Sequence, residues 1–340
     1  MNKKISPREY LPLLILLLLT ALVAVALILR PEPPEVKTEY FSDYFDTVSS
    51  VSDYSGGEDF DSVAALVEKR LSEYHELFDI YSEREEVRGV AYLNANAGGS
   101  AVALDTRVIE LLLYSKEIYT LTSGEVNIMM GSVLSLWHDC REGGGRVPTA
   151  AELSSRAEHT SIDSLVIDKE QSTARITDPE ASVDVGAIAK GYAVEMIRRE
   201  LEGLGYSGIV LDIGGNLSIV GNKPDGGGWR TGIINPDRSS DERYIHYLDV
   251  ADTSVVTSGD YERYYELDGV RYHHLIDKDT LMPARFFASV TVITKNSALA
   301  DALSTALFLM DLESGRALVD SLDGVDAVWV ESDGAVTLSD

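Results

Sequence analysis

The sequence predicts an α+β fold, in which mixed strands and helices form a single globular unit after an N-terminal transmembrane helix. Three observations support this prediction. The run from Tyr10 to Leu29 has no charged residue. After it, helical and strand-like patterns are mixed without the strict alternation of a parallel sheet. The length of 340 residues, with 45% hydrophobic residues, is enough for a sizeable core.

The uncharged run is long enough to span the hydrocarbon of a bilayer as a helix. Lys3, Lys4 and Arg8 precede it, so the positive-inside rule predicts a cytoplasmic N-terminus. A cleaved signal peptide is the alternative, because Ala24–Ala26 reads AVA like a cleavage site. These alanines lie inside the apolar run, however, and the run is long for a signal peptide.

We therefore expect four segments. Residues 1–9 are the cytoplasmic N-terminus, and residues 10–29 anchor the chain in the cell membrane by a single pass. Residues 30–39 are a Pro- and Glu-rich linker. Residues 40–340 form the extracytoplasmic catalytic domain.

The net charge of -27 excludes one class of partner. Nucleic acid requires clustered Lys and Arg on the protein surface, so it is not expected here. Any anionic ligand must be held locally, by a few cations or by a metal. Cys140 is the only cysteine, so no intramolecular disulfide can form.

The expected elements follow from apolar spacing and from turn residues. In the first half of the domain, Val63, Val67 and Leu71 lie on one side of a helix over 61–81, and a second helix fits 105–120. After a GGGRVP loop, short strand-like runs cover 164–168, 174–177 and 208–220.

Between the last two of these runs, a helix over 186–205 ends at Gly203 and Gly205. In the last part of the chain we expect strands over 244–250, 288–294 and 327–330. A helix begins at Ser297, between the second and third of these strands.

The first candidate site is DVGAIAKGYAVEM, from Asp184 to Met196. It lacks the order of a Walker loop and of a GxGxxG fingerprint. A helix start with free N–H groups, Lys190 in the first turns and Gly191 for close approach are nevertheless elements of a phosphate site. A helix that begins at a glycine, with a solvated lysine, is the alternative.

DIGGNL, from Asp212 to Leu217, follows a strand. Its paired glycines allow the backbone to approach a ligand or another segment. A tight turn is the simpler interpretation.

SALADALSTALF begins with Ser297, which can cap a helix. Asp301 and Thr305 are four residues apart, so both oxygens lie on one face. A carboxylate and a hydroxyl suit Mg²⁺, which prefers oxygen ligands. Alternatively, Asp301 only interacts favourably with the helix dipole.

His273 and His274 lie within a stretch crowded with Tyr and Asp. Adjacent residues of a strand point to opposite faces, so at most one of the two reaches a given site. A histidine near phosphate and metal could accept a proton from a hydroxyl. Two surface histidines are the alternative.

Taken together and in order, these motifs resemble the ApbE family of FAD:protein FMN transferases, in the form found in Gram-positive bacteria. The matching stretches are YLNANAGG, GEVNIMMGSVLSLWHDCR, VDVGAIAKGYAVE, DIGGNL, TSGDYERYYELDGVRYHHLIDKDTLMPA and ADALSTALF. They extend from about residue 40 to near the C-terminus, so the resemblance covers nearly all of the expected domain.

The resemblance implies an ApbE-like fold and Mg²⁺-dependent transfer of FMN from FAD to a Ser or Thr hydroxyl of an acceptor protein, with release of AMP. The catalytic residues would be His274, which activates the hydroxyl, and Asp301. The metal ligands would be Asp301, Thr305 and the backbone carbonyl of Ala187. The residues at FAD would be Asp184, Lys190 (at the pyrophosphate), Glu125, Val126, Asn127, Leu275 and Tyr81.

Two stretches depart from the family pattern. Many relatives stack a tyrosine on the flavin after a Ser-Thr pair, where YSEREE has Arg84, or Tyr81 one turn earlier. Many also read Gly-Ala-Phe-Asp where this chain reads Gly-Glu-Val-Asn from Gly124.

Two other functions use the same residues. The first is an FAD pyrophosphatase, which releases FMN and AMP to water with the same metal. The second is a non-catalytic, membrane-anchored flavin carrier. Its Asp-x-x-(Ser/Thr)-Gly-Ala-(Ser/Thr) motif is only approached here by TLTSGEV, which lacks the Asp and the Ala. The family suggests a redox-complex subunit or an extracellular flavoprotein as acceptor.

Overall fold

The computed structural model describes residues 15–22, 35–57, 59–82, 84, 86–224 and 226–339. The chain divides into two units, Met1–Glu35 and Val36–Asp340. In the first unit, residues 15–22 are helical. No helix within the described residues is long and apolar enough to cross a membrane. Most of the predicted anchor, residues 10–29, lies outside the described residues.

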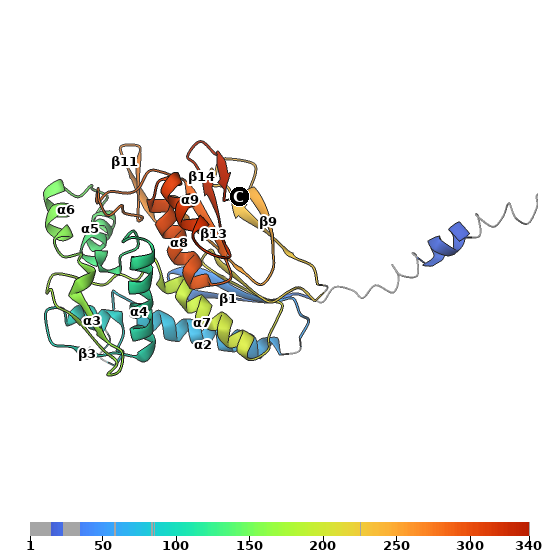
Figure 1. The fold of residues 1–340 in the computed structure, drawn as a ribbon, viewed down its shortest axis with the longest axis horizontal. Coiled ribbons are helices and arrows are strands. Elements are labelled where there is room, and N and C mark those ends of the chain that lie inside the picture. Colours follow the sequence, from blue (N-terminus) through green and yellow to red (C-terminus); the bar gives the residue numbers. More distant parts are fainter. Residues whose placement is uncertain are drawn as a thin grey trace, which may run out of the picture. The chain divides into compact units, whose positions relative to one another are not determined.

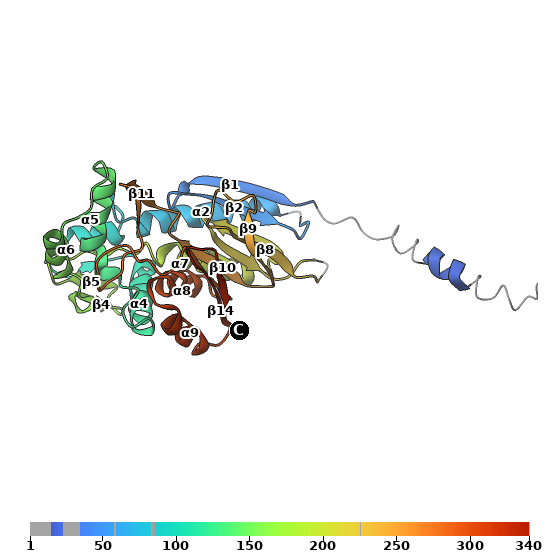
Figure 2. The ribbon, with the colours of Figure 1, turned by 90° about the horizontal axis from the view of Figure 1, so that it is seen from above.

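The second unit is built on an eight-stranded sheet in which neighbouring strands are antiparallel (Figures 1 and 2). Its strands in spatial order are β1 (Lys37–Tyr44), β2 (Thr47–Asp53), β6 (Ile209–Ile213), β7 (Asn216–Val220), β10 (Ser254–Gly259), β13 (Ser289–Thr294), β14 (Val325–Val330) and β15 (Val336–Leu338). β10 and β13 are rich in Val, Thr and Ile, which favour a buried, pleated surface.

Three helices pack together and against this sheet. They are α2 (Phe60–Phe78), α7 (Ala189–Gly203) and α8 (Ser297–Leu309). α8 packs against β10 and β13, and α7 lies between α8 and α2 (Figure 1). Nearly every residue of α8 is buried, as expected for a helix that is apolar all round. Asp301 and Thr305 are therefore polar residues on a core helix.

A mostly helical region holds the elements between residues 90 and 176. These are α3 (Val90–Ala95), β3 (Val102–Ala103), α4 (Thr106–Leu121), η1 (Ile128–Met130), α5 (Gly131–Glu142), α6 (Ala150–Ala157), η2 (Ile162–Ser164), β4 (Leu165–Asp168) and β5 (Thr173–Ile176). Two separate hairpins and a helix complete the unit: β8 (Trp229–Ile234) with β9 (Tyr244–Val250), β11 (Tyr264–Leu267) with β12 (Val270–His273), and α9 (Leu312–Asp320).

The mixed α+β architecture is confirmed, and the strand over 244–250 has the expected bounds. One prediction is corrected at residues 208–220, which form two strands instead of one run. Gly214 and Gly215 make the turn between β6 and β7, with φ of 56° and 86°. DIGGNL is therefore the tight turn that was its simpler interpretation, since such two-residue hairpins require positive φ.

The bounds of two helices also differ from the expectation. α7 begins at Ala189, after a turn, and not at residue 186. α8 is capped by Asn296, whose side chain accepts from the N–H of Leu299 at 3.1 Å. Ser297, the expected cap, is instead the first residue of the helix.

Candidate functional site

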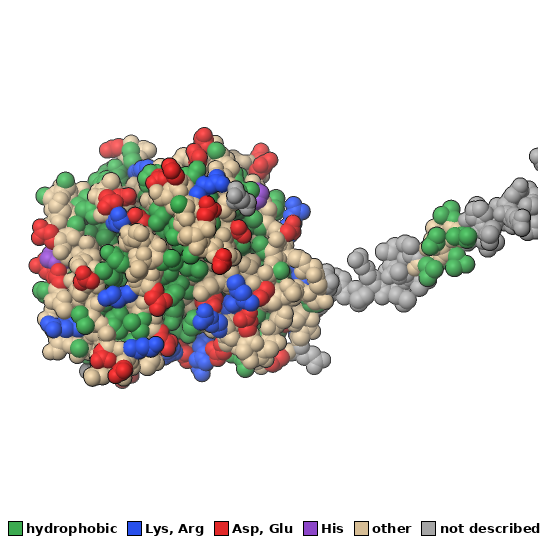
Figure 3. Space-filling view, viewed as in Figure 1, with side chains coloured by type: hydrophobic (Ala, Val, Ile, Leu, Met, Phe, Trp, Pro, Cys, Tyr) green, Lys and Arg blue, Asp and Glu red, His purple; other side chains and the backbone are tan. Residues whose placement is uncertain are grey.

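A cavity of about 500 Å³ lies among the β1–β2 turn, α5, the start of α7, α8 and the β11–β12 hairpin. The sequence-predicted residues that line it are Tyr81, Glu125, Val126, Asn127, Asp184, Ala187, Lys190, His274, Leu275, Asp301 and Thr305. The structure thus brings every predicted site residue to one space. On the face drawn in Figure 3, acidic side chains are spread widely over the second unit, so cations inside the cavity must hold any anion against the protein's overall charge.

Asp301 and Thr305 reach the cavity from α8. Both are buried, with 5% and 8% of their surface exposed. Oδ2 of Asp301 accepts the N–H of Gly191 at 2.7 Å, and the Oγ1 of Thr305 lies 3.4 Å from the Oγ of Ser258. Oδ1 of Asp301 accepts no hydrogen bond from the described residues and lies 3.6 Å from the ammonium of Lys190.

These groups fit a small, hard cation. A carboxylate oxygen, a hydroxyl and a backbone carbonyl are donors that Mg²⁺ prefers, with phosphate and water completing its shell, and Ala187 lines the same cavity as Asp301 and Thr305. Within the described residues no group of three or more His, Cys, Asp or Glu side chains could hold a metal. The described residues around Asp301 therefore do not form a site for a softer ion, which would need several side-chain ligands.

Lys190 is fixed by Asn216, the fifth residue of DIGGNL. Its ammonium donates to Oδ1 of Asn216 at 2.7 Å, and Asn216 is fully buried on β7. The lysine therefore projects into the cavity from a rigid support. The alternative of a solvated lysine is wrong for this residue.

Four of the N–H groups that were expected to be free at the start of α7 are occupied, those of Gly186, Ile188, Ala189 and Gly191. Gly186 donates to Oδ1 of Asp184, and both Ile188 and Ala189 donate to the carbonyl of Val185. Gly191 donates to Asp301, and a Cβ at this position would collide with the Cβ of Asp301 and lie 2.6 Å from the carbonyl oxygen of Ser297. Gly191 therefore permits contact between two helices and not the approach of a phosphate.

Asp184 organises the turn before α7. Its Oδ1 accepts from Gly186 at 2.8 Å, which closes the turn that presents Ala187 to the cavity. Burial raises the pKa of the Asp184 carboxyl, and the Gly186 hydrogen bond, Arg263 and His138 oppose this rise. The carboxyl carries its charge less readily than a solvated aspartate, which reduces its repulsion of an anionic ligand.

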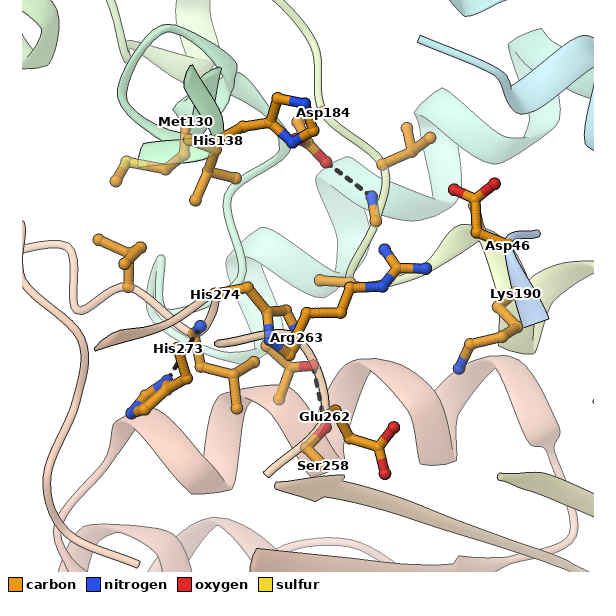
Figure 4. Close-up of a pocket in the computed structure, with 18 of the residues that line it drawn as sticks. Asp46, Met130, His138, Asp184, Lys190, Ser258, Glu262, Arg263, His273 and His274 are labelled. Carbon is orange, nitrogen blue, oxygen red and sulfur yellow. Dashed lines mark hydrogen bonds between the residues drawn. The ribbon is translucent and has the colours of Figure 1, made fainter. Parts of the chain in front are cut away.

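His273 is the last residue of β12 and His274 follows it; the two differ in exposure, but both line the cavity, so the prediction that at most one reaches the site is corrected. His273 is buried; its Nε2–H donates to the carbonyl of Ala284 at 2.8 Å, and its Nδ1 accepts from Leu275 at 3.2 Å. Burial lowers the pKa of His273. His274 is the exposed member of the pair at the cavity (Figure 4).

His274 is held neutral by its surroundings. Enclosure by protein atoms lowers its pKa, and Arg263, His273 and Lys190 lower it further. Its side chain remains open to solvent on the cavity side. A neutral imidazole that a substrate can reach is a suitable proton acceptor at neutral pH.

The stretch Glu125–Asn127 lines the cavity, but two of its side chains are held within the protein. The side chain of Asn127 accepts from the N–H of Met129 and donates to the carbonyl of Thr160. Its amide is thus engaged within the protein. Val126 is 2% exposed, which restricts it to apolar contact.

Glu125 forms an ion pair with Lys278 at 3.3 Å. Burial raises the pKa of the Glu125 carboxyl, and Lys278 opposes that rise. Leu275 is also buried, beside the hairpin that carries His274. Glu125 and Leu275 both line the cavity. Their contacts with FAD remain predictions.

The structure distinguishes the two candidates for flavin stacking. Tyr81 is 65% exposed, lines the cavity and lies 5.2 Å from the ring of His138, centre to centre. Arg84 is not among the lining residues and pairs with Glu76 at 2.7 Å on the surface. Of these two candidates, only Tyr81 presents an aromatic ring to the cavity.

Several lining residues were missed from the sequence. Asn216, Arg263, Ser258 and His138 all contact or line the site. A signal for Arg263 was present, because Asp268-Gly269 is a two-residue hairpin turn. Pairing outward from that turn places Arg263 opposite His274.

Combined, the cavity holds a fixed ammonium, hard oxygen donors and a neutral imidazole. This arrangement can bind a phosphate ester and accept a proton from an attacking hydroxyl.

Comparison with known proteins agrees with this chemistry. The family model described as the ApbE family matches residues 45–329. A FAD:protein FMN transferase of Vibrio cholerae is 31% identical over 269 residues, which cover 78% of each chain. Its counterpart of Treponema pallidum is 31% identical over 294 residues, covering 81% of each chain.

Solved structures give the same result for the fold. The crystal structure of the ApbE protein from Thermotoga maritima superposes with a TM-score of 0.80 at 28% identity, covering 90% of this chain and 97% of that one. The apo form of the flavinyl transferase ApbE from Pseudomonas stutzeri superposes with a TM-score of 0.76 at 28% identity, covering 90% and 95%.

Proposed function

The chain belongs to the ApbE family, and on this basis we propose that it transfers FMN from FAD to a Ser or Thr hydroxyl of an acceptor protein, with Mg²⁺ as cofactor and AMP as the second product. One observation carries the proposal. A single cavity contains neutral His274, the fixed ammonium of Lys190 and the oxygen donors of Asp301 and Thr305.

The reaction exchanges one P–O bond for another. The acceptor hydroxyl oxygen forms a bond to the phosphorus of the FMN half, and the bond from that phosphorus to the bridging oxygen breaks. The bridging oxygen leaves with AMP. His274 takes the hydroxyl proton, because its imidazole is uncharged and accessible from the cavity.

Lys190 binds the pyrophosphate in this scheme. Asn216 fixes its ammonium, so little side-chain entropy is lost when the substrate binds. Asp301, Thr305 and the carbonyl of Ala187 would hold Mg²⁺, which supplies neutralisation of phosphate charge when bound. The acidic protein makes this neutralisation more important.

The test uses the full chain in detergent with FAD, Mg²⁺ and an acceptor peptide that bears the Asp-x-x-(Ser/Thr)-Gly-Ala-(Ser/Thr) motif. The intact mass of the acceptor is measured with wild type, with Asp301→Ala and with EDTA. We expect the acceptor to gain one FMN with wild type alone. FMN and AMP in solution with an unmodified acceptor would instead identify a pyrophosphatase, and FAD binding without either product would identify a carrier.

We also propose that residues 10–29 anchor the chain in the cell membrane with the catalytic domain outside the cytoplasm. The uncharged run after Lys3, Lys4 and Arg8 supports this topology. Alkaline extraction of membranes, followed by protease treatment of intact spheroplasts, tests it. Release of the full-length chain by alkali, or protection of the domain from protease, would contradict the proposal.

A further inference from the structure

We propose that Arg263 is a second phosphate-binding residue, which contacts the FAD pyrophosphate from the hairpin side of the cavity while Lys190 contacts it from α7. The inference rests on the proposed function, because it assigns a second binding residue to the proposed substrate, FAD. Three observations support it: the hairpin register, the absence of a carboxylate partner, and the direction of the side chain.

The register of the β11–β12 hairpin sets the position of Arg263. Tyr264 pairs with His273, and the N–H of His274 donates to the carbonyl of Arg263 at 3.1 Å. Arg263 and His274 are therefore directly opposite each other, and such cross-strand neighbours project from the same face. The guanidinium thus lies beside the residue that is proposed to take the hydroxyl proton.

The charge of Arg263 is not neutralised within the protein. Among the described residues, no carboxylate oxygen lies within 4.0 Å of its guanidinium, whereas Arg70 and Arg107 each have carboxylate partners at 2.8 Å. Its guanidinium donates instead to the carbonyl of Phe45, which accepts from Nη2 at 3.3 Å. In a chain of net charge -27, an arginine without a carboxylate in a cavity is well suited to an anionic ligand.

Figure 4 shows the guanidinium of Arg263 directed into the same space as the ammonium of Lys190. Asp46 and Glu262 also line this part of the cavity, without approaching the guanidinium closely enough for an ion pair. The hydrogen bond to Phe45, in the β1–β2 turn, holds one N–H of a five-donor group and leaves the others for a ligand.

The role of Arg263 follows from the bond exchange. Negative charge on the phosphoryl oxygens and on the departing AMP must be stabilised while the acceptor oxygen attacks. Arg263 would donate hydrogen bonds to these oxygens without transferring a proton, because a guanidinium stays protonated. The hydroxyl proton still goes to His274.

The experiment compares Arg263→Gln, Arg263→Lys and the control Arg285→Gln. Arg285 is a matched control: it likewise donates to one backbone carbonyl, that of Arg271 at 2.7 Å, and lacks a carboxylate within 4.0 Å among the described residues, but it does not line the cavity. The kcat for FMN transfer is measured with saturating FAD, Mg²⁺ and acceptor peptide. FAD and riboflavin affinities are measured by fluorescence quenching.

We expect Arg263→Gln to lower kcat by about 100- to 1,000-fold and to weaken FAD binding by about 10- to 100-fold. Riboflavin has no phosphate, so its affinity should stay within about 2-fold of wild type. Arg263→Lys should recover part of the lost kcat, because it keeps the charge. Arg285→Gln should match wild type.

Equal kcat and FAD affinity for Arg263→Gln and Arg285→Gln would overturn the inference, as would equal weakening of FAD and riboflavin. Thermal unfolding monitors folding of each variant, and a folded Arg263→Lys decides the question if the glutamine variant does not fold. Absence of transfer by wild type would count against the proposed function alone, since the two affinities still test the phosphate contact.

Discussion

The backbone N–H of Gly191 donates a 2.7 Å hydrogen bond to Oδ2 of Asp301, which joins α7 to α8 at the proposed metal ligand. A side chain at Gly191 would collide with Asp301 and with the carbonyl of Ser297. The orientation of the Asp301 carboxylate therefore depends on the absence of a Cβ at position 191 of the neighbouring helix α7. The glycine is needed for packing, and through packing for the site.

We predict that Gly191→Ala destabilises the protein by about 1–3 kcal/mol, because the two helices must separate to admit the methyl group. It should also raise the Mg²⁺ concentration needed for half-maximal FMN transfer, because Asp301 is displaced. Urea denaturation and a Mg²⁺ titration of activity measure the two effects. The matched control is Gly203→Ala on the same helix, where a Cβ meets no atom within 4 Å; it should leave both unchanged or increase stability by up to about 1 kcal/mol. A Gly191→Ala variant that equals this control would show that the helices can adjust.

The pH dependence of transfer should report His274. Its pKa is lowered from an ordinary value of about 6.5, so the neutral base is present at pH 7 and is lost only as the pH falls through the lowered value. We predict that kcat/KM for the acceptor is level through about pH 6.5, the ordinary value for histidine, and declines only as the pH approaches the lowered value of about 3. The rate is measured from about pH 3 to 9 with folding verified at each pH.

His274→Gln should lower kcat by about 10²- to 10⁴-fold and remove the acid decline. His159→Gln is the control, since His159 pairs with Asp178 outside the cavity and should leave the profile unchanged. An acid decline that persists in His274→Gln would assign it to another group, for example Asp184.

Much of the site could be predicted from local sequence because its spacing is local. The separation of Asp301 and Thr305 by one helical turn places them on one face, and the adjacency of His273 and His274 places one of them in the core. These relationships depend only on the periodicity of the element. The structure agrees with them: Asp301 and Thr305 line the same cavity, and His273 is buried.

The missed residues depend on pairing between distant segments. Asn216 reaches Lys190 only because β7 and α7 pack together, 26 residues apart in the chain. Gly191 was interpreted as a ligand-facing glycine because the position of α8 cannot be read from the sequence around it. In the same way, the hydrogen bonds that occupy the N–H groups before α7 depend on the turn made by Asp184 and Val185.

The N-terminus of α8 is held by a buried carboxylate on α7. Oε2 of Glu195 accepts the N–H of Ser297 at 3.0 Å and also pairs with Arg198 at 3.2 Å. Both charged side chains are at most 4% exposed. We predict that Glu195→Ala destabilises the protein by about 3–5 kcal/mol, because it leaves a buried guanidinium with less compensation. Glu200→Ala, which removes the half-exposed pair with Arg70 from the same helix, should cost at most about 1 kcal/mol. Similar midpoints in urea for the two variants would contradict the prediction.

Tyr81 and Arg84 provide the last prediction, which concerns the flavin ring. Tyr81 presents an exposed ring to the cavity beside His138, whereas Arg84 is paired with Glu76 outside it. Stacking of a planar ring on an aromatic side chain contributes about 0.5–1.5 kcal/mol beyond area burial. We therefore expect Tyr81→Ala to weaken riboflavin and FAD binding alike, by about 3- to 10-fold, and Tyr81→Phe to retain wild-type affinity.

Arg84→Ala is the control at the other candidate position for flavin stacking, and it should leave both affinities unchanged. Fluorescence quenching of FAD and riboflavin measures all three variants. Loss of affinity in Arg84→Ala but not in Tyr81→Ala would mean that the loop after Tyr81 rearranges when flavin binds, and that the arginine plane covers the ring. Weakening of FAD without riboflavin in Tyr81→Ala would instead place the tyrosine at the nucleotide half of the substrate, because only FAD carries that half.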